Sequence, residues 1–497
     1  MIAACQTSSA LCTNMLVFMK SLSQNIYQIE TMVKAKEVEL RESLKREFTS
    51  IYQLCLNILE SNPNQEVVLV AVQTLYEYVR WVPLEHIFST PTVAVLVKLL
   101  PMPEYRNDAL KTLTEIVAQP RPPDVPMSAY VELYRIFSET FTQMVPPGTD
   151  LKIAYKQATM DDKRFIEQMS FFFTELFGKH EEGIETANKA GFAQGIDYLI
   201  EITKVANMEM FNTCLQFWRH FAQSFVRPGR VLRGRNSATE RNYYAPQMHR
   251  LREFLVTRMA KPEEVLVVED EYGNIVRETD VKDGEVARYR VMREIMRYLT
   301  VLDHEDTEDL LREHLKRQVS GEFKWDTLNT ICWAIGSISG MMSEDQESRF
   351  LVSNIRDLLN LCETARGKNN KAVIASNIMY VVGQYPNFLR AHWRFLYTVV
   401  QKLFEFMHES HPGVQDMACN TFLKIVKKCR SKFITVQSGE SSPYLEKILL
   451  IMPDLIKDLE PQQQEVFYEA VAVLIHAVPE PTTKQLLMQQ QQQQQQQ

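Results

Sequence analysis

Apolar residues recur at helical spacing along almost the whole chain, in segments that Pro, Asn or Gly residues separate. At 3.6 residues per turn, such spacing places the apolar side chains on one face of each helix. In the first half the pattern predicts helices over Ala10–Asn25, Ala35–Ser61, Glu66–Trp81, Arg106–Ala118, Ser128–Val145, Lys163–His180, Phe192–Val205 and Met208–Val226. In the second half it predicts helices over Pro246–Met259, Val286–Leu302, Glu305–Val319, Trp325–Met342, Asp345–Thr364, Asn370–Gln384, Phe388–His408, Val414–Cys429, Tyr444–Leu459 and Gln462–Val478.

The length and return of these helices favour an all-α fold built from repeats. Paired helices that return about every 40–50 residues are typical of HEAT repeats. The sequence therefore predicts an α-solenoid of paired antiparallel helices. Because no crisp repeat motif is visible, periodicity alone leaves an irregular all-helical domain as the alternative. Only 16 of the 497 residues are glycine and 45% are apolar, which favours extended helical structure over sheets and tight turns.

One segment departs from the helical pattern. Val265–Glu278 contains two short β-branched runs around a turn of Asp, Gly and Asn, which predicts an inserted β-hairpin. Between residues 263 and 285, nine acids stand against two bases, and a solvated connection is the alternative interpretation. We therefore predict four parts: HEAT repeats over 1–262, the acidic insertion over 263–285, HEAT repeats over 286–480, and a disordered tail over 481–497. The tail ends in nine glutamines and has low complexity.

Composition excludes several functional classes. The formal net charge of −7 disfavours direct binding to nucleic acid, although the Arg-rich segment Arg227–Arg235 is either a basic patch or a solvated loop. Eight cysteines and ten histidines include no metal-finger spacing, and Gly367–Lys371 lacks the spaced glycines of a phosphate-binding loop. No apolar run reaches the roughly 18 residues that a membrane helix needs. We therefore predict a soluble, non-enzymatic protein with no cofactor, metal ion or membrane insertion.

Three helical stretches in the second half carry the candidate binding surface. Each presents one face that mixes apolar groups with a thiol or an ammonium, which is unusual for a closed core. A second face of the middle helix, with Ile374, Ile378, Val381 and Val382, is wholly apolar. A helix with two non-polar faces needs two packing partners, and we expect one of them to be a ligand. The mixed faces consist of Ile355, Leu359 and Cys362; Lys368, Lys371, Ala372, Ala375 and Met379; and Phe395, Thr398, Val399, Lys402 and Phe406.

The same region resembles the karyopherin-β family of nuclear export receptors. The motifs that carry the resemblance are Leu328–Gly340, Arg366–Tyr380, Phe388–Trp393, Lys402–Glu409 and Val414–Cys419. The similarity is nearly continuous from about Trp325 to Phe433 and continues more weakly upstream, through Arg258–Glu269, to about Ser9. It implies a HEAT-repeat receptor that binds leucine-rich nuclear export signals, Ran-GTP and nucleoporins. It also implies a protein that moves between nucleus and cytoplasm through the nuclear pore.

The resemblance gives roles to two sets of residues. The thirteen residues of the mixed faces would form the export-signal groove, in which the thiol of Cys362 is open to covalent attack. From the residues alone, a buried core cysteine is the alternative, and the nearby Arg366, Lys368 and Lys371 predict a lowered thiol pKa. The acidic insertion would contact Ran and the back of the groove through Glu269, Asp270, Glu271, Glu278, Asp280 and Asp283.

The resemblance covers only the middle of the family's chain. We therefore expect this sequence to lack the flanking repeats that hold most of the Ran contact, and we expect coupling to Ran to be weak. A HEAT-repeat scaffold without cargo or transport activity is the alternative function. In that case the mixed faces would simply pack on neighbouring repeats.

Overall fold

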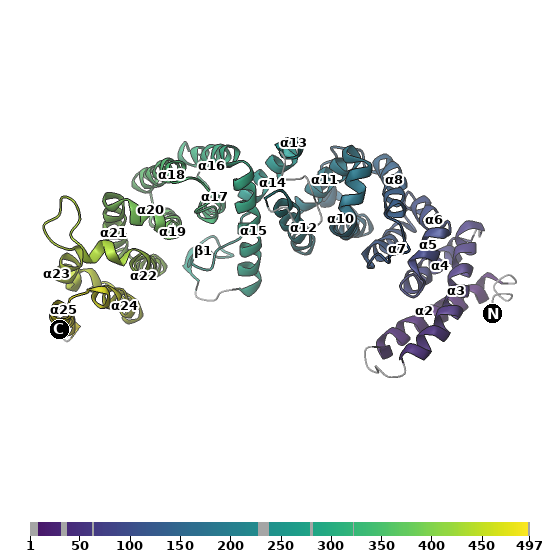
Figure 1. The fold of residues 1–497 in the computed structure, drawn as a ribbon, viewed down its shortest axis with the longest axis horizontal. Helices are drawn as coiled ribbons and strands as arrows, with labels where there is room; N and C mark the ends of the chain where they lie inside the picture. The colour runs from purple at the N-terminus through teal and green to yellow at the C-terminus, as the bar shows by residue number, and fades with distance from the viewer. Residues whose placement is uncertain are drawn as a thin grey trace. The chain divides into compact units, whose positions relative to one another are not determined.

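The computed structural model describes residues 8–30, 37–61, 64–226, 238–278, 282–321 and 323–495. These residues are helical almost throughout, with one two-stranded sheet (Figure 1). They form two compact units, residues 1–224 with 228–247 and residues 225–227 with 248–497, which we call unit 1 and unit 2. The predicted Arg-rich segment, residues 227–235, lies outside the described residues.

Unit 1 is a row of helices in which packing partners are often two or three helices apart in sequence. Helix α4 packs on α2 and α7, and α7 packs on α10. Asn64 begins α4 by accepting hydrogen bonds from the backbone N–H groups of Glu66 and Val67, at 3.0 and 3.3 Å. The helices of this unit are α2 Ser9–Glu30, α3 Glu37–Ser61, α4 Gln65–Tyr78, α5 Leu84–Ser89, α6 Thr92–Leu99, α7 Arg106–Ala118, α8 Met127–Met144, α9 Leu151–Gln157, α10 Met160–Ala187, α11 Lys189–Thr203 and α13 Ala238–Tyr243.

Unit 2 holds the region of the predicted site. Two helices, α12 Met208–Val226 and α14 Ala245–Thr257, cross the boundary between the units. The remaining elements are β1 Val267–Glu269, β2 Ile275–Arg277, α15 Asp283–Leu302, α16 His304–Val319, α17 Trp325–Ser337, α18 Glu344–Thr364, α19 Lys368–Gln384, α20 Pro386–Ala391, α21 Trp393–Met407, α22 Pro412–Ile434, α23 Tyr444–Ile456, α24 Pro461–Ala477 and α25 Pro481–Gln495.

Helices of unit 2 pack in two rows. One row runs through α15, α17, α19, α22 and α24, each in contact with the next. The second row includes the contacts of α16 with α18 and of α21 with α23, while α18 and α21 each also pack on α19. Such alternation, in which each helix pair contacts only its neighbours, is the packing of a helical repeat. Because α19 has neighbours in both rows, every residue from Ala372 to Gln384 is buried.

The inserted hairpin is present as predicted. Strands β1 and β2 pair antiparallel, with Val267 opposite Arg277 and Glu269 opposite Ile275. Gly273 closes the turn at φ +80°, a left-handed conformation that glycine adopts without steric cost. The hairpin contacts α19 and α22.

Some predicted elements differ from the structure. The predicted helix Phe388–His408 is two helices, α20 and α21, because the backbone leaves the helical region at His392, with φ −119° and ψ 82°. The short helices α5, α6, α9 and α13 carry too few turns to leave a clear period and were missed.

The predicted disordered tail is a helix over Pro481–Gln495, and its last two glutamines lie outside the described residues. Glutamine loses little side-chain freedom in a helix. The helix also packs on α23 and α24.

Candidate functional site

Helices α18 and α21 flank a cavity of about 250 Å³ whose floor belongs to α19. Its walls are mainly apolar, with Lys402 and Glu405 at the polar side joined by an ion pair of 2.6 Å. Nζ of Lys402 also lies 5.8 Å from the ring centre of Phe406. The lining consists of Ile355, Leu359, Glu363, Ile378, Val382, Phe395, Thr398, Val399, Gln401, Lys402, Leu403, Glu405 and Phe406. We call this surface the groove.

The local sequence explains why the groove walls take these positions. Helix α18 begins with a capping box in which Ser343 and Gln346 bond each other's backbone N–H groups. From that start, Ile355 and Leu359 fall one turn apart on the same face. Helix α21 repeats this spacing with Phe395 and Val399. Thr398 turns its hydroxyl to the carbonyl oxygen of Arg394, at 3.0 Å, so its polar atom is satisfied within the helix.

The structure brings seven of the thirteen predicted groove residues into the lining. They are Ile355, Leu359, Phe395, Thr398, Val399, Lys402 and Phe406. The other six, which lie at the end of α18 or along α19, are Cys362, Lys368, Lys371, Ala372, Ala375 and Met379.

Helix α19 presents a different apolar face to the groove from the one the sequence indicated. Ile378 and Val382 line the cavity, whereas Met379, Gly383 and Gln384 line a second hollow of about 180 Å³ beside the hairpin. One residue along a helix is a rotation of about 100°. The wholly apolar face that the sequence set apart is therefore the one that forms the floor, and Ala372 and Ala375 are buried at 5% and 2% exposure.

Sequence reasoning missed the polar members of the lining. Glu363, Gln401 and Glu405 are scattered between apolar positions, and nothing in the helical period distinguishes them from solvated side chains. Leu403 was also missed, although it lies one turn from Val399 on the predicted face. The signal that could have revealed these four residues is their position, because each lies three or four residues from a predicted groove residue.

The lysines at the start of α19 remain at the surface. Lys368 is the first residue of the helix, and both Lys368 and Lys371 are exposed. Gly367 precedes them at φ +92°, which favours glycine at the point where the chain turns into the helix. Both ammonium groups are thus accessible to a ligand near this end of α19.

Cys362 is half-buried, whereas the other six described cysteines are buried. Burial raises the pKa of the Cys362 thiol above its ordinary value, and the positive charges of Lys402 and Lys371 oppose this without cancelling it. The predicted lowering of the thiol pKa was therefore wrong. The sequence revealed the nearby cations but not the burial of the sulfur, which disfavours the thiolate more strongly.

The hairpin is fixed behind α19 by several polar contacts. Arg277 pairs with Asp416 at 2.5 Å and with Glu460 at 3.0 Å, and His411 Nε2 lies 3.2 Å from the carbonyl oxygen of Ile275. The sulfur of Met417 links two elements, since it accepts from the hydroxyl of Ser376 on α19 at 3.2 Å and from the backbone N–H of Leu266 at 3.5 Å. The hairpin thus shares a buried contact with the helix that forms the groove floor.

The predicted acidic residues divide into structural and exposed groups. Glu278 pairs with Lys261 at 2.5 Å. Asp270 accepts the backbone N–H groups of Asn274 and Tyr272 inside the turn, and these bonds, that of Asn274 first, lower the carboxyl pKa. Glu269, Glu271 and Asp283 are exposed. Asp280 lies outside the described residues.

Within the described ranges, no three His, Cys, Asp or Glu side chains are grouped so that they could hold a metal ion. None of the helices over the same residues combines the length and apolarity that crossing a bilayer requires.

Comparison with family models gives four matches along the chain. Residues 1–113 match an exportin 1-like protein, and residues 191–225 match a chromosome region maintenance or exportin repeat. Residues 240–307 match CRM1/exportin repeat 2, and residues 320–369 match CRM1/exportin repeat 3. The third of these matches contains the hairpin, and the fourth contains α18.

Curated relatives agree with these models. Protein EXPORTIN 1A of Arabidopsis thaliana is 45% identical over 97% of this chain and 47% of its own length. Exportin-1 of Drosophila melanogaster is 41% identical over 96% of this chain and 46% of its own length. Exportin-1 of Schizosaccharomyces pombe is 39% identical over 96% of this chain and 47% of its own length. The chain spans about half the length of the curated relatives it matches.

A solved structure of importin-13 in its cytosolic state has the same fold. It aligns with 94% of this chain and 54% of its own chain, with a TM-score of 0.69 and 13% identity. The likeness confirms the predicted all-α, solenoid-type fold. The chain is therefore a homologue of exportin-1 proteins along 96–97% of its own length and 46–47% of theirs.

Proposed function

We propose that the chain is a nuclear export receptor that binds leucine-rich export signals in the groove between α18 and α21. The observation that carries the proposal is the apolar groove itself, in a chain homologous to exportins. An export signal presents four or five Leu-like side chains at helical and then extended spacing. Burying each of them is worth roughly 1.5–3 kcal/mol before ordering costs.

The charges around the groove fit such a peptide. Lys402, the cation of the lining, pairs with Glu405, and Glu363 is the remaining charged group of the otherwise mainly apolar wall. Lys368 and Lys371 are exposed at the start of α19, where they could meet acidic side chains or backbone carbonyls of a bound peptide. The groove thus favours a mainly apolar ligand with acidic flanks. Cargo bound in this way would be carried between nucleus and cytoplasm through the nuclear pore, in contact with nucleoporins.

Filling the groove tests this proposal. Thr398→Trp places an indole in the cavity at an exposed helical threonine, and Thr186→Trp on α10 is the matched control. Both hydroxyls bond only the carbonyl oxygen four residues earlier, at 3.0 and 2.6 Å, so their loss should affect folding little and similarly. A fluorescent export peptide should bind the wild type and the Thr186→Trp variant alike, and Thr398→Trp at least tenfold more weakly.

The alternative of a scaffold without cargo has a distinct outcome. In that case the export peptide would bind no better than a control peptide with its leucines replaced by alanine. Equal binding by the Thr398→Trp and Thr186→Trp variants would place any export-signal site elsewhere on the chain.

We also propose that the exposed acids of the hairpin contact Ran in its GTP form. Glu269, Glu271 and Asp283 are exposed, and the hairpin that carries two of them also contacts α19 behind the groove. A contact made by exposed carboxylates should be strongly screened by salt. Substituting Glu271→Lys should therefore weaken Ran-GTP binding at low salt, while Glu308→Lys on α16 should not. If both variants bind Ran-GTP as the wild type does, the hairpin acids are not the contact.

A further inference from the structure

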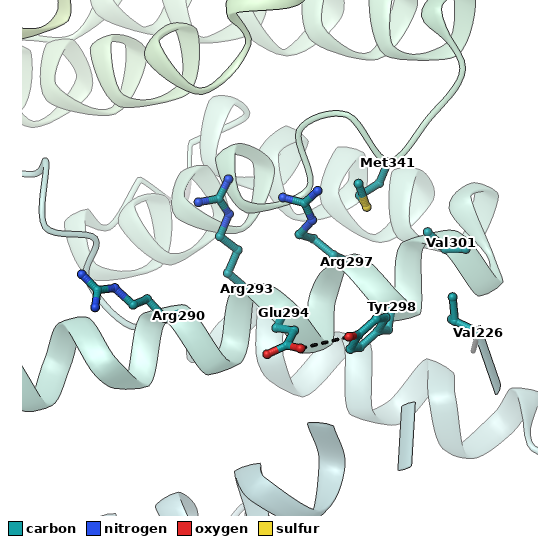
Figure 2. A pocket seen from close by; sticks show the side chains of 8 residues that line it. All are labelled: Val226, Arg290, Arg293, Glu294, Arg297, Tyr298, Val301 and Met341. Atoms are coloured by element: carbon teal, nitrogen blue, oxygen red, sulfur yellow. Dashed lines mark hydrogen bonds between the residues drawn. The ribbon is translucent and has the colours of Figure 1, made fainter. Parts of the chain in front are cut away.

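A second hollow of unit 2, with a volume of about 540 Å³, lies along α15 (Figure 2). Three arginines on this helix contribute to it, at positions i, i+3 and i+7, so they share one side of the helix. Apolar side chains at the end of α12, at the end of α15 and after α17 contribute the rest of the wall. The lining consists of Val226, Arg290, Arg293, Glu294, Arg297, Tyr298, Val301 and Met341. We call this cavity the arginine hollow.

Arg293 and Arg297 extend from α15 in the same direction, as Figure 2 shows. Among the residues that the structure describes, neither guanidinium forms an ion pair. The Nε atom of Arg293 is buried and has no hydrogen-bond partner there. Arg290 differs, because its side chain is 73% exposed and lies 3.6 Å from Glu263.

The acid in this lining does not neutralise the two arginines. Glu294 accepts a hydrogen bond from the Tyr298 hydroxyl at 2.9 Å, on another side of α15 in Figure 2. Burial, and next the positive charge of Arg293, lower the pKa of Arg297. Like charges one helical turn apart repel each other. The hollow therefore holds two positive groups whose repulsion an anion would relieve.

We propose that the arginine hollow binds the phosphate group of a phosphorylated peptide. Two forked guanidinium groups can donate to several oxygens at once, and a phosphate offers three strong acceptors. Val226, Val301 and Met341 supply an apolar wall for a neighbouring side chain of the peptide. The volume lies within the range of about 300–1,000 Å³ that ligand sites usually have.

Other anions fit less well. A polymeric nucleic acid is disfavoured by the net charge of −7 and by the acids Glu263 and Glu294 close to the arginines. A free inorganic phosphate would leave the apolar part of the hollow without a contact. The proposal concerns a different cavity from the groove and does not depend on export-signal binding.

Fluorescence anisotropy with a labelled pentapeptide, glycine–valine–phosphoserine–valine–glycine, tests the proposal on the full chain. At low salt the phosphopeptide should bind at least tenfold more tightly than the same peptide with serine. The double variant Arg293→Gln, Arg297→Gln should lose at least tenfold of this affinity. The control Arg312→Gln removes an exposed arginine of α16 that pairs with Asp309 at 2.8 Å, and it should change affinity less than twofold.

A further variant, Arg297→Lys, tests whether the forked guanidinium itself is needed. Arg297→Lys keeps the charge but removes the fork, so it should weaken binding about threefold or more while leaving the helical circular dichroism spectrum unchanged. It also serves as the test if the double variant does not fold.

Several outcomes would overturn the proposal. These are equal binding of the phosphorylated and unphosphorylated peptides, or equal binding by wild type and Arg297→Lys. Inorganic phosphate that competes as well as the phosphopeptide would indicate an adventitious ion only. Inositol hexakisphosphate that binds with far higher affinity than the phosphopeptide would assign the hollow to a small polyanion instead.

Discussion

The groove and the arginine hollow belong to the same unit and differ in how their charges are compensated. In the groove, Lys402 has Glu405 at 2.6 Å, and apolar side chains form most of the wall. In the hollow, Arg293 and Arg297 have no described carboxylate partner. A mainly apolar cavity whose cation is already paired gains most from burying an apolar ligand, whereas one with unpaired cations gains most from an anion. The comparison thus assigns different ligand chemistry to two cavities of unit 2.

The largest effect should come from a charge placed in the apolar wall of the groove. Val399→Asp should weaken binding of a leucine-rich export peptide at least about thirtyfold, or about 2 kcal/mol, because a leucine would be buried against a carboxylate. The control is Val301→Asp in the arginine hollow, at a more exposed valine, which should change export-peptide affinity less than twofold. Equal losses in the two variants, with unchanged helical circular dichroism, would remove the distinction between the cavities.

The next largest effect should be a difference in how ionic strength changes ligand affinity at the two cavities. Raising NaCl from low to about 0.5 M shortens the Debye length to roughly 4 Å. We expect phosphopeptide affinity to fall more than tenfold and export-peptide affinity to fall less than threefold. Parallel anisotropy titrations over the same salt series measure both. Similar slopes would mean that charge contributes equally to the two sites.

Thiol chemistry sharpens the description of the groove. Burial raises the Cys362 pKa, and Lys402 is the main opposing charge. Lys402→Met should therefore slow alkylation of Cys362 by iodoacetamide at pH 8 by roughly threefold, because less thiolate is present. In the wild type the rate should keep rising as pH passes 9.0, the ordinary thiol value.

Peptide mapping by mass spectrometry compares the alkylation rate of Cys362 with the rates of the buried cysteines. Cys362 is half-buried, while Cys332 and Cys419 are buried, so Cys362 should react first. Bound export peptide should protect it, since Lys402 lines the groove. Labelling of Cys362 that bound peptide leaves unchanged would place the sulfur outside the peptide's footprint.

The smallest effect should appear in stability. Removing one of two like charges at i and i+4 relieves a repulsion worth about 0.2–0.5 kcal/mol. Arg297→Gln should thus leave the free energy of unfolding unchanged or raise it by that amount. Lys402→Gln breaks the ion pair with Glu405, three residues on, and should lower the free energy of unfolding by a similar amount. Urea unfolding of both variants tests the opposite signs.

The sequence by itself determined the helical architecture and most of the groove walls. Period 3.6 placed Ile355 with Leu359 and Phe395 with Val399 on single faces, and the switch to β-branched runs located the hairpin. These features follow from local spacing and residue type. The resemblance of the second half to export receptors likewise depended on contiguous residues.

Tertiary structure decided how those faces are used. Helix α19 has two apolar faces one residue apart, and only its packing on the hairpin and α22 turns Met379 away and directs Ile378 and Val382 to the groove. The raised pKa of Cys362 depends on burial by neighbouring helices. The arginines of α15 are visible in the sequence, but the absence of described carboxylate partners is not. Spacing along a chain fixes which residues share a face, whereas burial and charge pairing depend on residues far away in sequence that the fold brings near.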